Sequence, residues 1–339
     1  MIEDFIRGIP KAELHVHLEG TLEPALMLEL GRRNGVDPPA AADAQAHTDC
    51  AFDDLAHFLR VYYAGVNVLR TERDFHDLTA AYLRRARADG VRHAEVFFDP
   101  QSHVPRGVSF DVVVNGIAGA LDEAERAWGM TSRLILCFLR DLGPQAAADT
   151  LSMALPRRDV IAGVGLDSAE AGHPPSAFAD VFAAARAAGL VAVAHAGEEG
   201  PADYVWEALD ALHVRRIDHG VRAVDDAALV ARLVRERTPL TMCPLSNLYL
   251  QVVRSLEEHP LKRLLDAGVR VTVNSDDPAY FCGYLADNYL AVQQALQLSA
   301  ADIRTLARNS IQASLLPAAR IQELLAEIDA FAAGFGMTA

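Results

Sequence analysis

Residues 11–20 read KAELHVHLEG, an apolar run that carries two imidazoles and closes on a carboxylate and a glycine. Side chains two residues apart on a β-strand share one face, so His15 and His17 should point the same way. Either histidine alone could be a core residue bonded to backbone carbonyls. As a pair near the end of a strand, they are better explained as two ligands of one metal ion.

The same kind of apolar, strand-like segment recurs along the chain. The expected strands are 12–18, 91–99, 133–139, 161–167, 190–197, 216–220, 239–244 and 269–276. The segments between them show helical spacing, are rich in Ala, Leu, Arg and Glu, and often stop at glycine. Alternation of continuously apolar strands with helices predicts an α/β fold of the (β/α)₈ TIM barrel type.

Two parts of the chain exceed a minimal barrel. The interval of about 21–90 is too long for one crossover, and we expect it to form several helices as an insertion over the barrel mouth. The residues from about 299 to 339 should form appended C-terminal helices, with Ser299 as an N-cap. No linker, repeat or low-complexity tract interrupts the sequence, so we expect a single domain over 1–339.

Charge and hydropathy exclude several classes of partner. Acidic residues outnumber basic ones by 46 to 31, for a formal net charge of -15, which argues against a nucleic-acid partner. No apolar run approaches the roughly 18 residues of a membrane span. The N-terminus, MIEDFIRGIP, lacks the basic and apolar regions of a signal peptide. We therefore expect no membrane association and a cytoplasmic location.

The cysteines give no sign of cross-linking or of a thiolate metal site. Cys50, Cys137, Cys243 and Cys282 are scattered without a C-x-x-C pair, so neither a disulfide framework nor a Cys-rich zinc site is expected. Three of them lie in apolar runs, where a buried, inert thiol is the simplest interpretation.

Polar residues that close the strands mark the expected site, because the active site of such a barrel forms at the carboxyl ends of its strands. These residues are His15, His17, His195, Glu198, His219, Asp276 and Asp277. A single strand-end histidine is often structural, and the paired aspartates before Pro278 could be only a turn. Because four strands deliver such groups to one mouth, a shared site explains them better.

The chemistry of a metal site assigns a role to each of these groups. His15, His17, His195 and Asp276 form a nitrogen-rich donor set that suits zinc and leaves a position for water. Zinc would lower the pKa of that water towards neutrality. Glu198, a carboxyl whose pKa burial would raise, could hand a proton to the substrate. His219 could orient or deprotonate the water.

Five ordered motifs, ELHVHLEG, HAGE, RIDHG, CPLSN and NSDDP, resemble the adenosine and adenine deaminase family of amidohydrolase-type barrels, from about residue 9 to about 315. The resemblance implies one zinc per chain on the four residues above. It also implies that Glu198 protonates purine N1, that His219 positions the hydroxide attacking C6, and that Asp277 bonds to N7. Cytidine-type deaminases are excluded, because Cys243-Pro244 has no second cysteine to complete their P-C-x-x-C signature.

Two departures from the nucleoside deaminases of the family point to a free base as substrate. Those enzymes typically read HLDG where this chain has Glu19, and they have a glycine-containing turn where this chain reads GLDSAEAGHPP. Glu170 would then project towards the N3 and N9 side of the ring and accept the N–H of a free base. Both carboxylates also have a structural explanation, Glu19 as a brace of the turn and Glu170 as a cap of a helix starting near Ser176.

The predicted function is therefore zinc-dependent hydrolytic deamination of adenine to hypoxanthine and ammonia, a step of purine salvage. Adenosine, 6-aminodeoxyfutalosine or an N6-substituted adenine would keep the chemistry and change the substrate. A catalytically silent barrel that acts as a binding protein is a further alternative, against which the complete set of ligands and the acid argue. The sequence leaves open the oligomeric state and whether iron replaces zinc.

Overall fold

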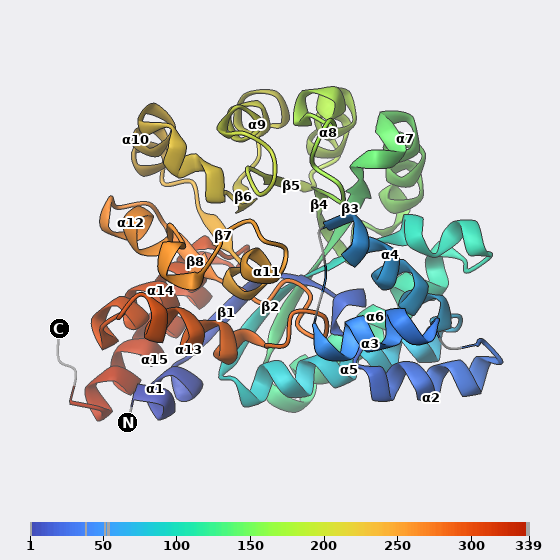
Figure 1. The fold of residues 1–339 in the computed structure, drawn as a ribbon, viewed down its shortest axis with the longest axis horizontal. Helices are drawn as coiled ribbons and strands as arrows, with labels where there is room; N and C mark the ends of the chain where they lie inside the picture. The colour runs from blue at the N-terminus through green and yellow to red at the C-terminus, as the bar shows by residue number, and fades with distance from the viewer. Residues whose placement is uncertain (1, 38, 51, 53–54, 337–339) are drawn as a thin grey trace.

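Eight parallel strands form the centre of the molecule. The computed structural model describes residues 2–37, 39–50, 52 and 55–336, and its strands pair in the order β1-β2-β3-β4-β5-β6-β7-β8. Their bounds are β1 Lys11–His17, β2 Val91–Phe98, β3 Thr131–Leu139, β4 Ile161–Asp167, β5 Val191–Ala196, β6 Arg216–His219, β7 Leu240–Met242 and β8 Val271–Val273. The helices surround the strands (Figure 1), as predicted for a (β/α)₈ TIM barrel.

The barrel closes between β8 and β1 at the residues that matter for the site. Val16 and Asp276 form an isolated parallel bridge. The backbone N–H of His17 donates to the carbonyl of Asp276 at 2.9 Å, and the N–H of Asp276 donates to the carbonyl of His15 at 3.1 Å. Closure of the ring therefore sets two histidines beside one aspartate, although 260 residues separate them in sequence.

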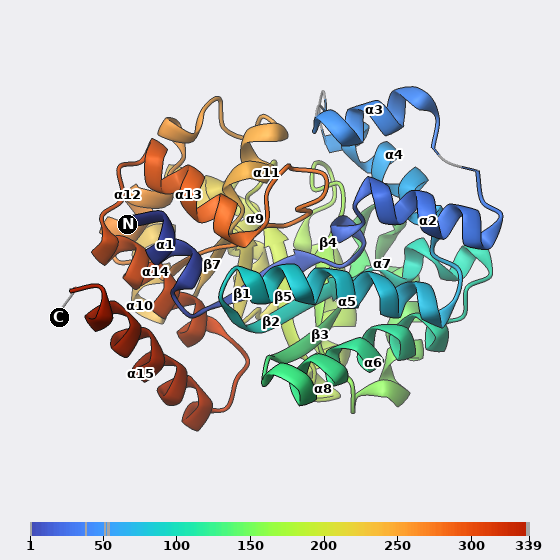
Figure 2. The same cartoon turned by 90° about the horizontal axis from the view of Figure 1, so that it is seen from below.

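A ring of helices covers the outside of the barrel. Its members after β2 are α6 Phe110–Trp128, α7 Gly143–Ala154, α8 Ala179–Ala187, α9 Ala202–Glu207, α10 Ala227–Glu236 and α12 Leu261–Asp266. Helix α11, Pro244–Tyr249, lies inside this ring at the strand ends, where Asn247 contacts His219. Helix α5, Glu72–Ala88, packs against α6 and β2 in the same outer layer (Figure 2). It begins at a capping box formed by Thr71 and Asp74.

The insertion over the mouth is shorter than the sequence suggested. Among the described residues of 21–90, the helices added over the mouth are α2 Pro24–Asn34, α3 Ala41–Asp49 and α4 Leu55–Gly65. The prediction of an insertion up to residue 90 was wrong for α5, because its apolar stripe covers β2 and α6 rather than the mouth. Helix α4 reaches the cavity through Phe58 and Tyr62.

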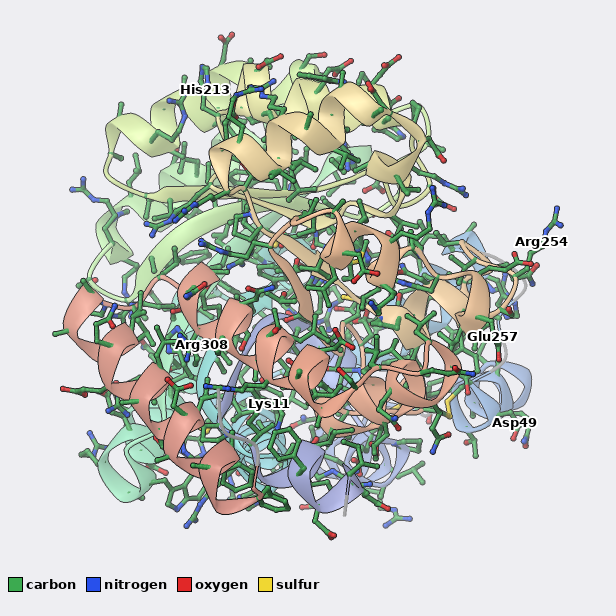
Figure 3. The ribbon with its side chains drawn as sticks, turned by 90° about the vertical axis from the view of Figure 1, so that its left-hand side faces the viewer. Lys11, Asp49, His213, Arg254, Glu257 and Arg308 are labelled. Carbon is green, nitrogen blue, oxygen red and sulfur yellow. A yellow bond between two sulfur atoms is a disulfide. The ribbon has the colours of Figure 1, made fainter. Side chains whose placement is uncertain are left out.

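The C-terminal helices also include one that belongs to the barrel. After α13, Leu285–Ala295, helix α14 runs from Ala300 to Ala313 and covers the seam of β1 and β8, viewed in Figure 3 with Arg308 labelled. Ser310 Oγ accepts the backbone N–H of Ala12 at 2.9 Å. Ser299 caps α14 in a capping box with Asp302, as predicted. Helix α15, Ala318–Gly334, packs on α1, Ile2–Gly8, through Phe331 and Phe5.

The cysteines differ from the prediction. Cys50 and Cys282 form a disulfide with their Cα atoms 5.9 Å apart, which joins the end of α3 (next to Asp49 in Figure 3) to the loop after β8. A separation of 232 residues gives no sequence pattern to detect. Cys137 and Cys243 are buried free thiols, as expected.

None of the described helices is both long enough and apolar enough to cross a bilayer.

Candidate active site

A cavity opens at the carboxyl ends of the strands, beneath α4. Its lining combines imidazole and carboxyl groups from the strand ends with apolar side chains from the insertion. The lining residues are His17, Leu55, Phe58, Leu59, Tyr62, Tyr63, Asp99, Leu139, Asp167, Ser168, His195, Glu198, His219, Leu250, Asp276 and Asp277. His15 lies fully buried directly behind this surface.

The predicted metal ligands converge in the structure. Nε2 of His15 lies 3.0 Å from Oδ1 of Asp276, and Nε2 of His17 lies 3.5 Å from the same oxygen. Nε2 of His17 and Nε2 of His195 are 3.2 Å apart. Lone pairs that face one another at these distances fit a cation shared by three imidazoles and a carboxylate. The group of four whose potential ligand atoms all lie within 4.8 Å of one another has His219 in place of His17, and it consists of His15, His195, His219 and Asp276.

Buried polar groups behind His15 fix the tautomer that a ligand needs. Thr241 donates its hydroxyl proton to Oδ1 of Asp218 at 2.8 Å, so its oxygen is left to accept the Nδ1 proton of His15 at 3.0 Å. Arg216 Nε donates to the same Asp218 oxygen at 3.1 Å. His15 is therefore held with its Nε2 lone pair towards Asp276, as outer groups commonly orient metal-binding histidines.

Burial keeps the other imidazoles neutral. It lowers the pKa of His17 to about 4 and that of His219 to about 3, and it holds the pKa of His195 well below its ordinary value. Burial alone would raise the pKa of Asp276, but the nearby rings of His15 and His219 outweigh it and lower this pKa. Neutral imidazoles with an ionised carboxylate are the protonation states of a divalent metal site.

Glu198 occupies the position of a proton donor. It follows β5, is 6% exposed, and its Oε1 has no hydrogen-bond partner among the described residues. Burial raises its pKa well above the ordinary range, and the charges of Asp276 and Glu170 add to the effect. A carboxyl that stays protonated at neutral pH can act as a general acid.

His219 lies between this acid and the ligand cluster. Its Nε2 is 3.5 Å from Oε2 of Glu198 and 3.8 Å from Oδ2 of Asp276. The amide of Asn247 donates to its Nδ1 at 3.3 Å, so the proton of the neutral ring is on Nε2. His219 and Asp276 both have positive φ angles, 61° and 62°, a backbone conformation that is disfavoured outside glycine and concentrates at functional sites.

Asp277 lines the cavity beside Asp276. Burial raises its pKa well above the ordinary value, and the charge of Asp276 does so further. A Cβ atom added to Gly20 would lie 1.9 Å from Oδ1 of Asp277. The glycine that follows the HLE of the first motif is therefore needed to leave space for this carboxyl group.

Glu170 does not point where the sequence reasoning placed it. Its carboxylate accepts the backbone N–H groups of Gly197 at 2.7 Å, Glu198 at 3.0 Å, Glu199 at 2.9 Å and Gly200 at 2.8 Å, and it does not line the cavity. The expectation that it accepts an N–H of the substrate is contradicted, because four main-chain donors already occupy its oxygens. The loop that carries Glu198 is what Glu170 holds.

Glu170 does not cap the helix that starts near Ser176 either. The backbone N–H of Ser176 donates to Oε2 of Glu207 at 3.0 Å instead.

Glu19 is likewise directed away from the cavity. Its Oε1 accepts the backbone N–H of Asp99 at 3.2 Å and Nε2 of His103 at 2.8 Å. Burial alone would raise its pKa, but the contact with His103 outweighs this and lowers it. Glu19 thus braces the turn after β2, so the structure favours the bracing explanation over a contact with substrate.

Two further carboxyl groups that face the cavity, those of Asp99 and Asp167, were missed. Asp99 directly follows β2 and Asp167 ends β4, so both meet the criterion of a polar residue that closes an apolar strand. Burial raises the pKa of Asp99 well above its ordinary value and that of Asp167 to about 7. The sequence signal was present, but it was applied only to strands with a histidine or a paired aspartate.

A TIM barrel whose strand ends bring together three imidazoles, a carboxylate and a buried protonated acid defines a metal-dependent hydrolase. The family model described as adenosine deaminase matches residues 10–331. The chain belongs to the adenosine deaminase family, whose enzymes are metal-dependent hydrolytic deaminases.

Relatives within this family share the fold over nearly their whole length. An adenine deaminase of Ralstonia nicotianae is 61% identical over 312 residues, which cover 91% of this chain and 90% of the relative. One of Hahella chejuensis is 54% identical, covering 97% and 99% of the two chains. The solved structure of the Arthrobacter aurescens adenine deaminase has a TM-score of 0.93 at 49% identity, covering 96% of this chain and 100% of that one.

Proposed function

We propose that this chain deaminates adenine to hypoxanthine and ammonia by hydrolysis, as a step of purine salvage. The observation that carries the proposal is the buried Glu198, whose pKa burial raises, beside His219 and the three-imidazole cluster. It is supported by relatives that are named adenine deaminases and are more than half identical to this chain.

We propose zinc as the metal, one ion per chain, held by His15, His17, His195 and Asp276. A bound zinc ion supplies Lewis acidity that brings the pKa of water towards neutrality. The nitrogen-rich donor set, the fixed tautomer of His15 and the neutral rings all suit it. An amidohydrolase of the same fold from Burkholderia ambifaria, with a TM-score of 0.90 at 28% identity and coverage of 98% and 94%, was solved with zinc.

The residues of the chain then divide the proton transfers. Glu198 donates its proton to N1, which makes C6 more electrophilic. His219 orients the attacking water through its Nε2 proton, and the ionised Asp276 beside it is the group that can accept a proton from the water. The new C6–O bond forms, the bond from C6 to the exocyclic nitrogen breaks, and the nitrogen leaves as ammonia with one of the two protons that the water released. The other proton returns to Glu198.

The remaining contacts hold the ring in place. Asp277 in its protonated form donates to N7, which is an acceptor in adenine. Leu55, Phe58 and Leu59 of α4, with Leu250 on the other side, offer apolar surfaces for a planar ring. A ring placed in this way presents C6 to the ligand cluster.

The test is a comparison of purines with zinc-loaded protein, by ammonia release. We expect kcat/KM for adenine to exceed that for adenosine by at least about two orders of magnitude, because a buried polar site rejects an analogue that leaves it unpaired. Turnover of adenosine, 6-aminodeoxyfutalosine or an N6-alkyl adenine at an equal or higher rate would overturn adenine as the substrate. Elemental analysis should find about one zinc per chain.

We also propose that the enzyme acts in the cytoplasm on a small purine, without nucleic acid. A disulfide such as Cys50–Cys282 persists mainly in oxidising compartments, so in the cytoplasm this pair should be reduced. Thiol trapping of the protein in intact cells tests the location: a fully oxidised pair would contradict it.

A further inference from the structure

Asp99 and Asp167 have no part in the chemistry described above, although they line the same cavity. In the eight-stranded ring, β2 lies opposite β6 and β4 lies opposite β8. The two carboxyl groups therefore lie on the side of the mouth away from β6 and β8, with His17 beside them. They stand where the far edge of a bound ring would lie.

Both groups are in a position to bind a ligand. Each residue is 3% exposed, and the two carboxyl groups contact each other. Oδ1 of Asp99 and Oδ1 of Asp167 receive no N–H or O–H donor from any residue that the structure describes. Buried polar atoms are nearly always hydrogen-bonded, so two such atoms at a cavity wall indicate that the ligand completes them.

The purine edge that faces them has a matching pattern. With N1 at Glu198 and N7 at Asp277, the opposite edge of adenine carries N3, an acceptor, and N9–H, a donor. A carboxyl oxygen without a partner is a hydrogen-bond acceptor, and the one donor on this edge of the ring is N9–H. The two oxygens left without a partner at the cavity wall therefore suit N9–H.

We propose that Asp99, held against Asp167, accepts the N9–H of the free base and thereby excludes nucleosides. The inference rests on the proposed deaminase function and names the residues that select its substrate. A nucleoside has no proton on N9, and its sugar would have to occupy the space of the two carboxyl groups.

The surroundings keep Asp99 in this place. Its own backbone N–H is bound by Glu19, which His103 in turn holds at 2.8 Å. Asp167 also lies 3.5 Å from Nδ1 of His17, so a change there would disturb a metal ligand as well. Asp99 is therefore the residue to change.

The experiment compares two proteins with two substrates. Asp99→Ala and the parent protein are assayed with adenine and with 9-methyladenine, which lacks the N9 proton. In the parent, kcat/KM for 9-methyladenine should be at least about 100-fold lower than for adenine. In Asp99→Ala, activity with adenine should fall by about 100-fold while activity with 9-methyladenine changes by only a few-fold, so that the ratio collapses towards one.

Two further variants make the result specific. Asp99→Asn should retain a large part of the ratio, because the amide oxygen can still accept N9–H. Asp141→Asn changes an exposed carboxylate just after the neighbouring strand β3 and should alter neither rate. Zinc content and melting temperature are measured for all variants. For a variant too slow to assay, the inhibition constants of hypoxanthine and 9-methylhypoxanthine are compared, and their ratio reports the same preference for an N9 proton.

The outcomes separate the two levels of the proposal. An unchanged ratio in Asp99→Ala, with adenine still deaminated, would overturn the role of Asp99 and leave the deaminase function intact. Since His17, Asp99 and Asp167 could also hold a cation, a second zinc that is present in the parent and lost in Asp99→Ala would overturn it too. A parent protein that releases no ammonia from any purine would instead refute the proposed function.

Discussion

The half of the cavity formed by β1, β5, β6 and β8 differs from the half formed by β2, β4 and α4. In the first half, barrel closure sets His15 and His17 beside Asp276, and the buried Thr241 and Asp218 fix the His15 ring. In the second half, Asp99 and Asp167 contact each other beneath apolar side chains of an inserted helix, and Asp167 also approaches His17. The comparison suggests that the first half carries the chemistry and the second half selects the substrate.

The largest effect should follow from a change in the first half. His15→Ala or His17→Ala removes one of the four donors, so metal and activity should be lost together. Elemental analysis after dialysis, alongside the ammonia assay, measures both. Full activity in metal-free protein would show that the first half does not work as a metal centre.

Loss of the proton donor should cost somewhat less. Glu198→Gln keeps the shape but has no acidic proton, so we expect kcat to fall by about 10² to 10⁴-fold at unchanged zinc content. Single-turnover rates with adenine report this step. A variant within a few-fold of the parent would show that Glu198 is not the acid.

An intermediate loss of activity is expected when the contact between Glu170 and the loop that carries Glu198 is weakened. Glu170→Gln replaces a carboxylate that accepts four backbone N–H groups of the loop carrying Glu198. Misplacement of the acid should lower kcat by about 10- to 100-fold, with zinc retained. The ratio of adenine to 9-methyladenine should stay as in the parent. A collapsed ratio would instead assign the selection of the base to Glu170.

The smallest effect on activity should come from the disulfide beside the inserted helices. Cys50→Ser frees the end of α3 from the loop after β8, and we expect a stability loss of about 2 to 4 kcal/mol with kcat within a few-fold of the parent. Thermal unfolding of the oxidised parent, the reduced parent and the variant gives the comparison. A loss of zinc in the variant would show that the two halves are not independent.

The first half of the site was largely predictable from sequence, because its signals are local. An i, i+2 histidine pair on an apolar strand and single polar residues at the ends of other strands identify groups that the barrel must bring to one mouth. The strand pattern likewise predicted the barrel itself. The assignment of α5 and α14 failed, since the surface that a helix covers depends on neighbours far along the chain.

The sequence by itself determined the barrel, the candidate ligands and the acid, since strand periodicity and strand ends are recognisable from a few neighbouring residues. Only the tertiary structure decided which carboxylates face the cavity. Glu170 turned to main-chain donors 27 to 30 residues away and Glu19 to donors 80 and 84 residues away. A buried carboxylate goes to the nearest unpaired donors, because leaving it without them costs several kcal/mol, and those donors are set by the folded chain.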